Sequence, residues 1–136
     1  MTEENKRKNI KSELDKASEI LSEANLLYKN DYISGAVSRL YYSMLHIIRA
    51  LLLTKGLEPK SHEGVLRIFS LHFVKEGPFD TKDAHLFARL MKYREEADYN
   101  PVYEFIEEDF VEFKKELECL SDKINEYLKE RGYFQP

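Results

Sequence analysis

A chain of 136 residues with 43% hydrophobic side chains has room for one domain, which buries roughly two-thirds of its unfolded surface. The single Cys119 excludes an internal disulfide, and the N-terminal segment lacks the apolar run of a signal peptide or a membrane span, so a cytoplasmic protein is expected. The net charge of -4 argues against strong nonspecific binding to nucleic acids.

The charge is distributed unevenly along the chain. Residues 31–94 carry ten basic and six acidic side chains, a net charge of +4, whereas residues 95–136 carry five basic and thirteen acidic ones, a net charge of -8. Any anionic ligand is therefore expected to bind at the middle segment. The alternative is that both regions are solvated helix faces.

Five Gly, four Pro and the lack of strand alternation predict an all-α fold. The first predicted helix shows one apolar stripe, formed by Ile10, Leu14, Ala17, Leu21, Ala24 and Tyr28. Asp31 is predicted to cap a second helix, which runs to about Lys55 and stops at Gly56. This second helix is apolar on more than one side, so it is either central in a bundle or part of a subunit interface.

Three further helices are predicted downstream. Ser61 caps the third, which ends before Gly77, and Thr81 or Asp80 caps the fourth. The last helix carries apolar residues at steps of three and four: Ile106, Phe110, Phe113, Leu117, Leu120, Ile124 and Tyr127. Short connections favour an antiparallel up-and-down bundle of four long helices plus a shorter one, spanning residues 1–136, with residues 1–8 and 131–136 fraying at its ends.

The most informative segment is residues 93–99, which places an arginine, acids and two phenols at the end of the fourth helix. The helical period puts Arg94 at the edge of the buried face, with Asp98 one turn further on. Asn100, in the left-handed conformation that Asn tolerates, and Pro101 are predicted to stop the helix. Arg94 either contacts a ligand or forms an ion pair with Asp98 that fixes the helix end.

Most conventional catalytic motifs are absent from the sequence. It has no glycine-rich phosphate loop and no paired Cys motif, and its four histidines are scattered over three predicted helices: His46, His62, His72 and His85. We therefore expect neither a metal site nor a cofactor. Cys119 lies beside the apolar register of the last helix, which favours a buried, inert thiol over a nucleophile.

Four segments together resemble the small stand-alone prokaryotic HEPN-domain proteins. They are residues 36–46, 59–64, 72–75 and 93–99, in order and with plausible spacing, and the match covers roughly residues 10–128. The resemblance implies a HEPN-like helical bundle, usually dimeric, found in nucleotide- and RNA-related systems. It also implies a frequent pairing with a minimal nucleotidyltransferase as toxin and antitoxin.

The resemblance also bears on catalysis. Active HEPN ribonucleases carry an arginine followed, after four to six residues, by a histidine, and Arg94 matches that arginine. No histidine follows it, because Tyr99 is at the first of these positions and Asn100 and Pro101 are at the others. A phenol with a pKa near 10 is a weak general base at neutral pH, so the catalytic motif is interpreted as degenerate. Arg94 is still able to bind a phosphate, and Tyr99 to stack on a base.

A second arginine and histidine pair has the same spacing. Arg39 is followed after six residues by His46, but this pair lies in the second predicted helix, where the family does not carry its motif. Two helical turns place both side chains on one face, within reach of one substrate. We favour the interpretation that they are polar bundle or interface residues beside Tyr42.

Two hypotheses for function follow. The first is a dimeric HEPN-type interaction module that binds a nucleotidyltransferase partner, RNA or a nucleotide, with ligand contacts from Arg94, Asp98, Tyr99, Arg39 and Tyr42. The second is a metal-independent, toxin-like endoribonuclease in which Arg94 acts with Tyr99 or His46. The missing histidine favours the first hypothesis, and a dimeric scaffold without a ligand remains a third possibility.

Overall fold

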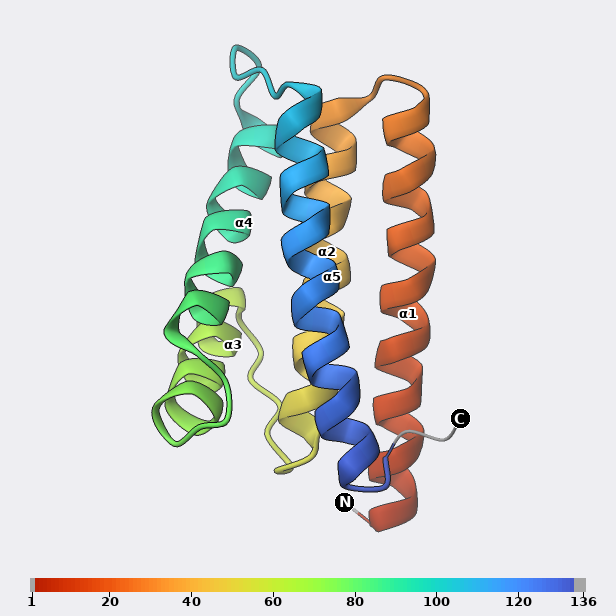
Figure 1. The fold of residues 1–136 in the computed structure, drawn as a ribbon, viewed down its shortest axis with the longest axis vertical. Helices are drawn as coiled ribbons and strands as arrows, with labels where there is room; N and C mark the ends of the chain where they lie inside the picture. Colours follow the sequence, from red (N-terminus) through yellow and green to blue (C-terminus); the bar gives the residue numbers. More distant parts are fainter. Residues whose placement is uncertain (1, 134–136) are drawn as a thin grey trace.

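The computed structural model describes residues 2–133, and this part of the chain is helical with no strand. The elements are α1 (Glu3–Lys29), α2 (Ile33–Leu53), α3 (His62–Phe69), the π-helical η1 (Ser70–Lys75), α4 (Thr81–Tyr99) and α5 (Glu107–Glu130). Four long helices lie side by side with short α3 packed near one end (Figure 1). The predicted all-α bundle of four long helices plus a shorter one is confirmed.

Helix α2 is the centre of the bundle. It packs against α1, α4 and α5 along its length and against α3 near its C-terminal half (Figure 1). Small residues let α1 approach closely: a Cβ on Gly35 would lie 3.4 Å from Leu27, and the Ser43 hydroxyl donates to the Ala17 carbonyl at 2.8 Å. The apolar sides of α2 are therefore buried within one chain, which is the first of the two predicted alternatives.

The turn between α1 and α2 differs from the prediction. Asp31 does not cap α2, because it has φ +65° and lies just beyond the end of α1. The N–H of Tyr32 donates to Leu27 and that of Asp31 to Tyr28, a pattern that ends a helix on a left-handed residue. The N-cap of α2 is Tyr32, which makes no side-chain cap.

Two other helix ends also needed correction. Helix α2 ends at Leu53, two residues before the predicted Lys55. Asn100 ends α4 as predicted but has φ -109° and ψ 102°, since the following Pro101 favours an extended residue over a left-handed one. Its side-chain amide donates to Glu96 at 2.7 Å, and its side-chain oxygen accepts from the N–H of Val102 at 3.1 Å.

Cys119 is exposed, and the prediction of a buried thiol is wrong. Its neighbours Leu117 and Leu120 face the core, but a helical residue between two such positions points away from them. At the chain ends, residues 3–8, expected to fray, belong to α1, and the Tyr133 hydroxyl donates to Glu3 at 3.0 Å. Met1 and residues 134–136, which the same expectation covers, lie outside the described residues.

A buried acid joins the start of α4 to α5. The carboxylate of Asp83, only 6% exposed, accepts from the N–H of Asp80 at 2.9 Å and from Lys123 at 2.8 Å. Asp83→Ala is expected to lower the free energy of unfolding by about 1–3 kcal/mol, because it removes a cap and leaves Lys123 with only its longer, 3.2 Å contact to Asp80. Urea denaturation measures this loss, with exposed Asp122→Ala as the matched control. Equal stability of the two variants would contradict the assignment.

Candidate functional site

Arg94 lies between α4 and α2, not in free solvent. Its side chain is 11% exposed, and its guanidinium lies 5.4 Å from the ring centre of Tyr41 and 5.8 Å from that of Tyr42. Asp98 approaches only to 4.0 Å, which is an ion pair but not a hydrogen bond. The Nε of Arg94 is buried without a hydrogen-bond partner. The guanidinium is thus held by two aromatic faces while its donors stay unfilled.

Tyr41 links this arginine to a histidine. The Tyr41 ring is fully buried, stacks on Phe87 at 5.6 Å, and forms a 2.7 Å hydrogen bond between its hydroxyl and Nδ1 of His62. His62 is the first residue of α3, and Ser61 caps that helix by accepting from the N–H of Gly64 at 2.9 Å, as predicted. The cap and the buried phenol therefore fix the half-buried imidazole next to Arg94.

The charges around this pair decide where its protons lie. Burial lowers the pKa of His62 below 6.5, and the positive charges of Arg94 and Arg49 lower it further, against smaller opposing effects of Glu63 and Glu95. Burial raises the pKa of Tyr41 well above its ordinary value. At neutral pH the phenol is protonated and the imidazole is neutral, and in the tautomer in which Tyr41 donates to Nδ1 the ring proton of His62 lies on Nε2. His62 then offers a donor, as the arginines do.

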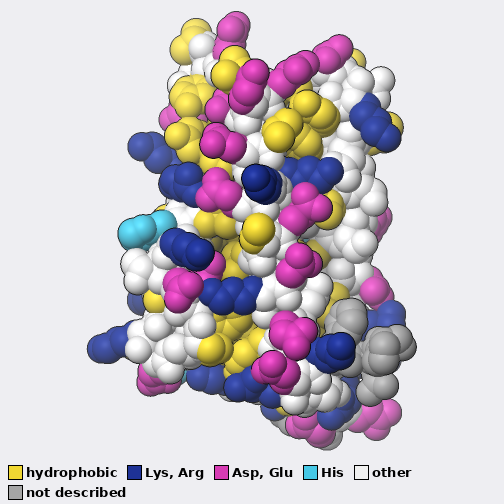
Figure 2. Space-filling view, viewed as in Figure 1, with side chains coloured by type: hydrophobic (Ala, Val, Ile, Leu, Met, Phe, Trp, Pro, Cys, Tyr) yellow, Lys and Arg dark blue, Asp and Glu magenta, His cyan; other side chains and the backbone are white. Residues whose placement is uncertain are grey.

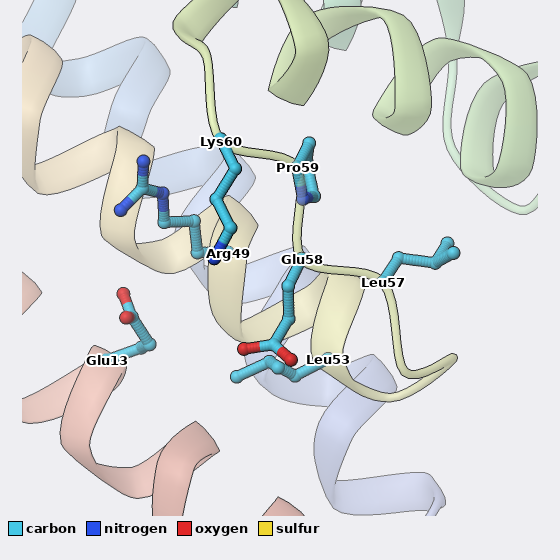
Figure 3. A pocket seen from close by; sticks show the side chains of 7 residues that line it. All are labelled: Glu13, Arg49, Leu53, Leu57, Glu58, Pro59 and Lys60. Atoms are coloured by element: carbon cyan, nitrogen blue, oxygen red, sulfur yellow. The ribbon is translucent and has the colours of Figure 1, made fainter. Parts of the chain in front are cut away.

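Arg49 is the second unfilled arginine of the site. Its Nε is buried without a partner, and no hydrogen bond in the described part of the chain engages its guanidinium. It lines a pocket between α1, α2 and the loop 54–61 (Figure 3). The positive charges of Arg94 and Arg49 both act on Tyr41 and His62, with Glu63 and Glu95 as weaker opposing charges. This arrangement is suited to holding an anion such as a phosphate.

The structure brings together four of the five predicted ligand contacts. Arg39 lies 5.9 Å from the Tyr42 ring on the side of Glu23, while Arg94 and Asp98 form the pair described above. Tyr99, the fifth, is 76% exposed. These positions do not test ligand binding, which stays a prediction.

His46 is placed away from the Arg94 group. Its Nδ1 bonds to the carboxylate of Glu13 at 2.7 Å, across the interface between α2 and α1. This contact agrees with the interpretation of His46 as a polar bundle residue. The histidine next to Arg94 is instead His62.

The state of His62 can be measured. Its protonation midpoint, followed by NMR, is expected below 6.5, and Arg94→Gln is expected to raise it because one nearby positive charge is lost. At pH values near and below 6.5, His62 is protonated more often in the unfolded chain than in the folded one. The free energy of unfolding therefore falls as the pH drops below 6.5. Lys92→Gln removes the same charge from an exposed position on α4 and is the control. A midpoint unchanged in Arg94→Gln would contradict the placement.

Comparison with known proteins decides the family. The HEPN domain family matches residues 10–129 of the chain, which includes every side chain of the site. The chain belongs to the HEPN-domain family.

Relatives of this HEPN protein cover nearly all of it. A protein named "Putative toxin" from Methanocaldococcus jannaschii is 37% identical over 124 residues, 91% of this chain and 92% of the relative. A "UPF0332 protein" from Thermotoga maritima is 35% identical over 115 residues, 85% of this chain and 87% of the relative. The resemblance to stand-alone prokaryotic HEPN proteins is thus confirmed. In residues 2–133 no helix combines the length and apolarity needed to cross a membrane.

Sequence reasoning missed three residues of this HEPN site: Tyr41, Arg49 and His62. Tyr41 and Arg49 belong to the second predicted helix, and the polar groups that they contact come from other helices. Those contacts cannot be predicted from the sequence of this helix alone. His62 follows the Ser61 cap, and its position at a helix start was a usable signal, but only the fold brings it to Arg94.

Proposed function

We propose that this HEPN protein is a toxin-like binding module for single-stranded RNA, which holds a backbone phosphate between Arg94, Arg49 and the Nε2–H of His62. The observation that carries this proposal is the pair of buried Nε atoms without hydrogen-bond partners, on Arg94 and Arg49, two arginines whose charges both act on the hydrogen-bonded Tyr41 and His62. Charge-assisted bonds to phosphate are about twice as strong as neutral ones, and unfilled buried donors favour such a ligand.

The test is a titration of a fluorescein-labelled pentanucleotide, r(UUUUU), followed by anisotropy at low salt in chelator. Binding is expected and should weaken as salt rises, because phosphate contacts release counterions. Inorganic phosphate and uridine monophosphate serve as competitors, and either one competing as well as the RNA would reassign the site to small nucleotides. No binding at protein concentrations up to about 1 mM would overturn the proposal.

A metal-independent endoribonuclease is the second candidate. The observation that favours it is the imidazole of His62 beside Arg94, since an imidazole suits general acid and base chemistry. The expected tautomer opposes it, because an Nε2 that carries the proton cannot accept another. Nitrogen NMR of His62 and incubation with labelled RNA in chelator distinguish the two candidates. RNA cleavage that is lost in both His62→Gln and Arg94→Gln would establish the enzyme.

A dimer is also proposed, with a surface at the end of the bundle. Exposed apolar side chains gather there on the turn after α1 and the loop after α4, namely Leu26, Tyr32, Tyr99, Val102, Tyr103 and Ile106. Figure 2 shows acidic side chains around the same end of the visible face. A patch of this kind favours association, whereas the acids oppose it at low salt.

Sedimentation at micromolar concentration is expected to give a species of twice the 16.1 kDa chain, favoured by added salt. Val102→Asp, at a side chain 84% exposed, is expected to yield the monomer without loss of stability. Exposed Val111→Asp on α5 is the matched control. A 16.1 kDa species at all salt concentrations would contradict the dimer.

The partner protein proposed is a minimal nucleotidyltransferase, as the family resemblance implies. The net charge of -8 over residues 95–136 favours a basic surface on that partner. Co-expression with a small nucleotidyltransferase from a neighbouring reading frame is expected to give a complex that survives size-exclusion chromatography. Separate elution of the two proteins would remove this part of the proposal.

A further inference from the structure

A pocket of about 240 Å³ adjoins the proposed phosphate site and has no role in it so far (Figure 3). It lies between α1, α2 and the loop 54–61, and Arg49 belongs to both the pocket and the phosphate site. Leu53, Leu57 and Pro59 give it apolar lining. The volume exceeds that of one water molecule several-fold, so an organic group fits.

The loop that forms one side of the pocket is fixed. A Cβ on Gly64 would lie 2.8 Å from the Ser61 hydroxyl and 3.3 Å from the Pro59 ring, so the absence of a side chain at Gly64 lets Pro59 pack against α3. The N–H of Leu57 donates to the carbonyl of Leu52 at 3.1 Å, which holds the start of the loop on α2. The pocket is therefore formed before any ligand enters.

The polar groups of the pocket include both donors and acceptors. Arg49 and Lys60 are donors, and Glu13 and Glu58 are acceptors; the Lys60 side chain runs toward Arg49, whereas the Glu58 carboxylate lies beside Leu53 (Figure 3). Glu13 is engaged by His46 at 2.7 Å, whereas no hydrogen bond or ion pair of the described residues engages Glu58. Two carboxylates would repel a simple anion. They suit a flat, neutral group that carries donors and acceptors together.

We propose that this pocket binds a guanine base of the RNA whose phosphate lies on Arg94, an inference that rests on the proposed function. Guanine presents O6 and N7 as acceptors, which match Arg49 and Lys60, and the N1–H and N2–H₂ donors, which match the free carboxylate of Glu58. The base faces contact Leu53, Leu57 and Pro59. Adenine keeps N7 but has an amine donor in place of O6 and lacks N1–H and the N2 amine, so Arg49 and Lys60 would lose one acceptor and Glu58 would lose its pair of donors.

The test compares r(UUGUU), r(UUAUU) and r(UUUUU) by anisotropy in chelator, with wild type, Glu58→Gln and Glu118→Gln. Glu118 is an exposed acid on α5, so its variant makes the same charge change outside the pocket. Wild type and Glu118→Gln are expected to prefer r(UUGUU) by about tenfold or more. Glu58→Gln is expected to reduce this preference to below about threefold, because a neutral amide is a weaker acceptor than a carboxylate.

Each outcome assigns success or failure to one proposal. Equal binding of all three RNAs by wild type, or a guanine preference unchanged in Glu58→Gln, would overturn the guanine pocket and leave the phosphate site standing. Failure of all three RNAs to bind would overturn the proposed function. The measured quantity is the ratio of the affinities for two RNAs. Removing one negative charge from the protein raises both affinities alike and therefore does not change this ratio.

Discussion

Arg94→Gln is expected to weaken the binding of r(UUUUU) by about tenfold to a hundredfold, the effect of losing about 1.5–3 kcal/mol of charge-assisted hydrogen bonding. The Arg94 side chain is 11% exposed, and its guanidinium lies over two phenol rings and has no hydrogen bond that a ligand must displace. Glutamine retains a polar side chain but loses the charge and the forked donors.

The control for this prediction is Lys92→Gln, which removes one exposed positive charge from the same helix. It is expected to change affinity by less than about threefold, because an exposed charge contributes only through screened attraction. Thermal unfolding of both variants checks that α4 remains in place. Equal losses of affinity would mean that Arg94 acts through net charge alone.

Phe87→Ala is expected to lower the free energy of unfolding by about 3–5 kcal/mol. Phe87 is fully buried on α4, and its ring lies 5.6 Å from that of Tyr41 with an angle of 7° between the planes. The truncation leaves a cavity between α4 and α2, against the ring of Tyr41 whose hydroxyl bonds to His62. Urea denaturation measures the loss.

Phe87→Leu is the matched control, since it retains most of the buried volume and is expected to cost less than about 1.5 kcal/mol. Where Phe87→Leu remains folded, its His62 signal is expected to broaden, because Tyr41 loses an aromatic neighbour. A loss below about 1 kcal/mol in Phe87→Ala would contradict the close packing of α4 on α2.

The sequence predicted the helices well because their apolar period is long and regular. In α5, residues from Phe110 to Tyr127 keep one register, and all of its predicted core positions within the helix are buried. The ends were harder to predict, since Asp31 is suited both to starting α2 and to ending α1. Only the pairing of the Tyr32 N–H with Leu27 decides between these roles.

Only the part of the site that lies along one helix was predicted from the sequence. Arg94 and Asp98 are four residues apart on one helix, so their proximity follows from the helical repeat. Tyr41 and His62 are 21 residues apart, and their 2.7 Å contact depends on the angle at which α3 meets α2. Residue spacing along one helix does not determine the angle between two helices. The position of His62 beside Arg94 could therefore not be predicted from the sequence.

The proposed function depends on phosphate binding by the guanidinium groups of Arg94 and Arg49. Proton and nitrogen NMR of the arginine Nε–H groups during titration with r(UUUUU) tests this most directly. Phosphate binding at this site is expected to shift the Nε–H signals of Arg94 and Arg49 downfield and to shift the ring signals of His62. All of these shifts should reach their final values at the same RNA concentration. Shifts confined to exposed arginines such as Arg89, with Arg94 and Arg49 unchanged at saturation, would contradict the proposed function.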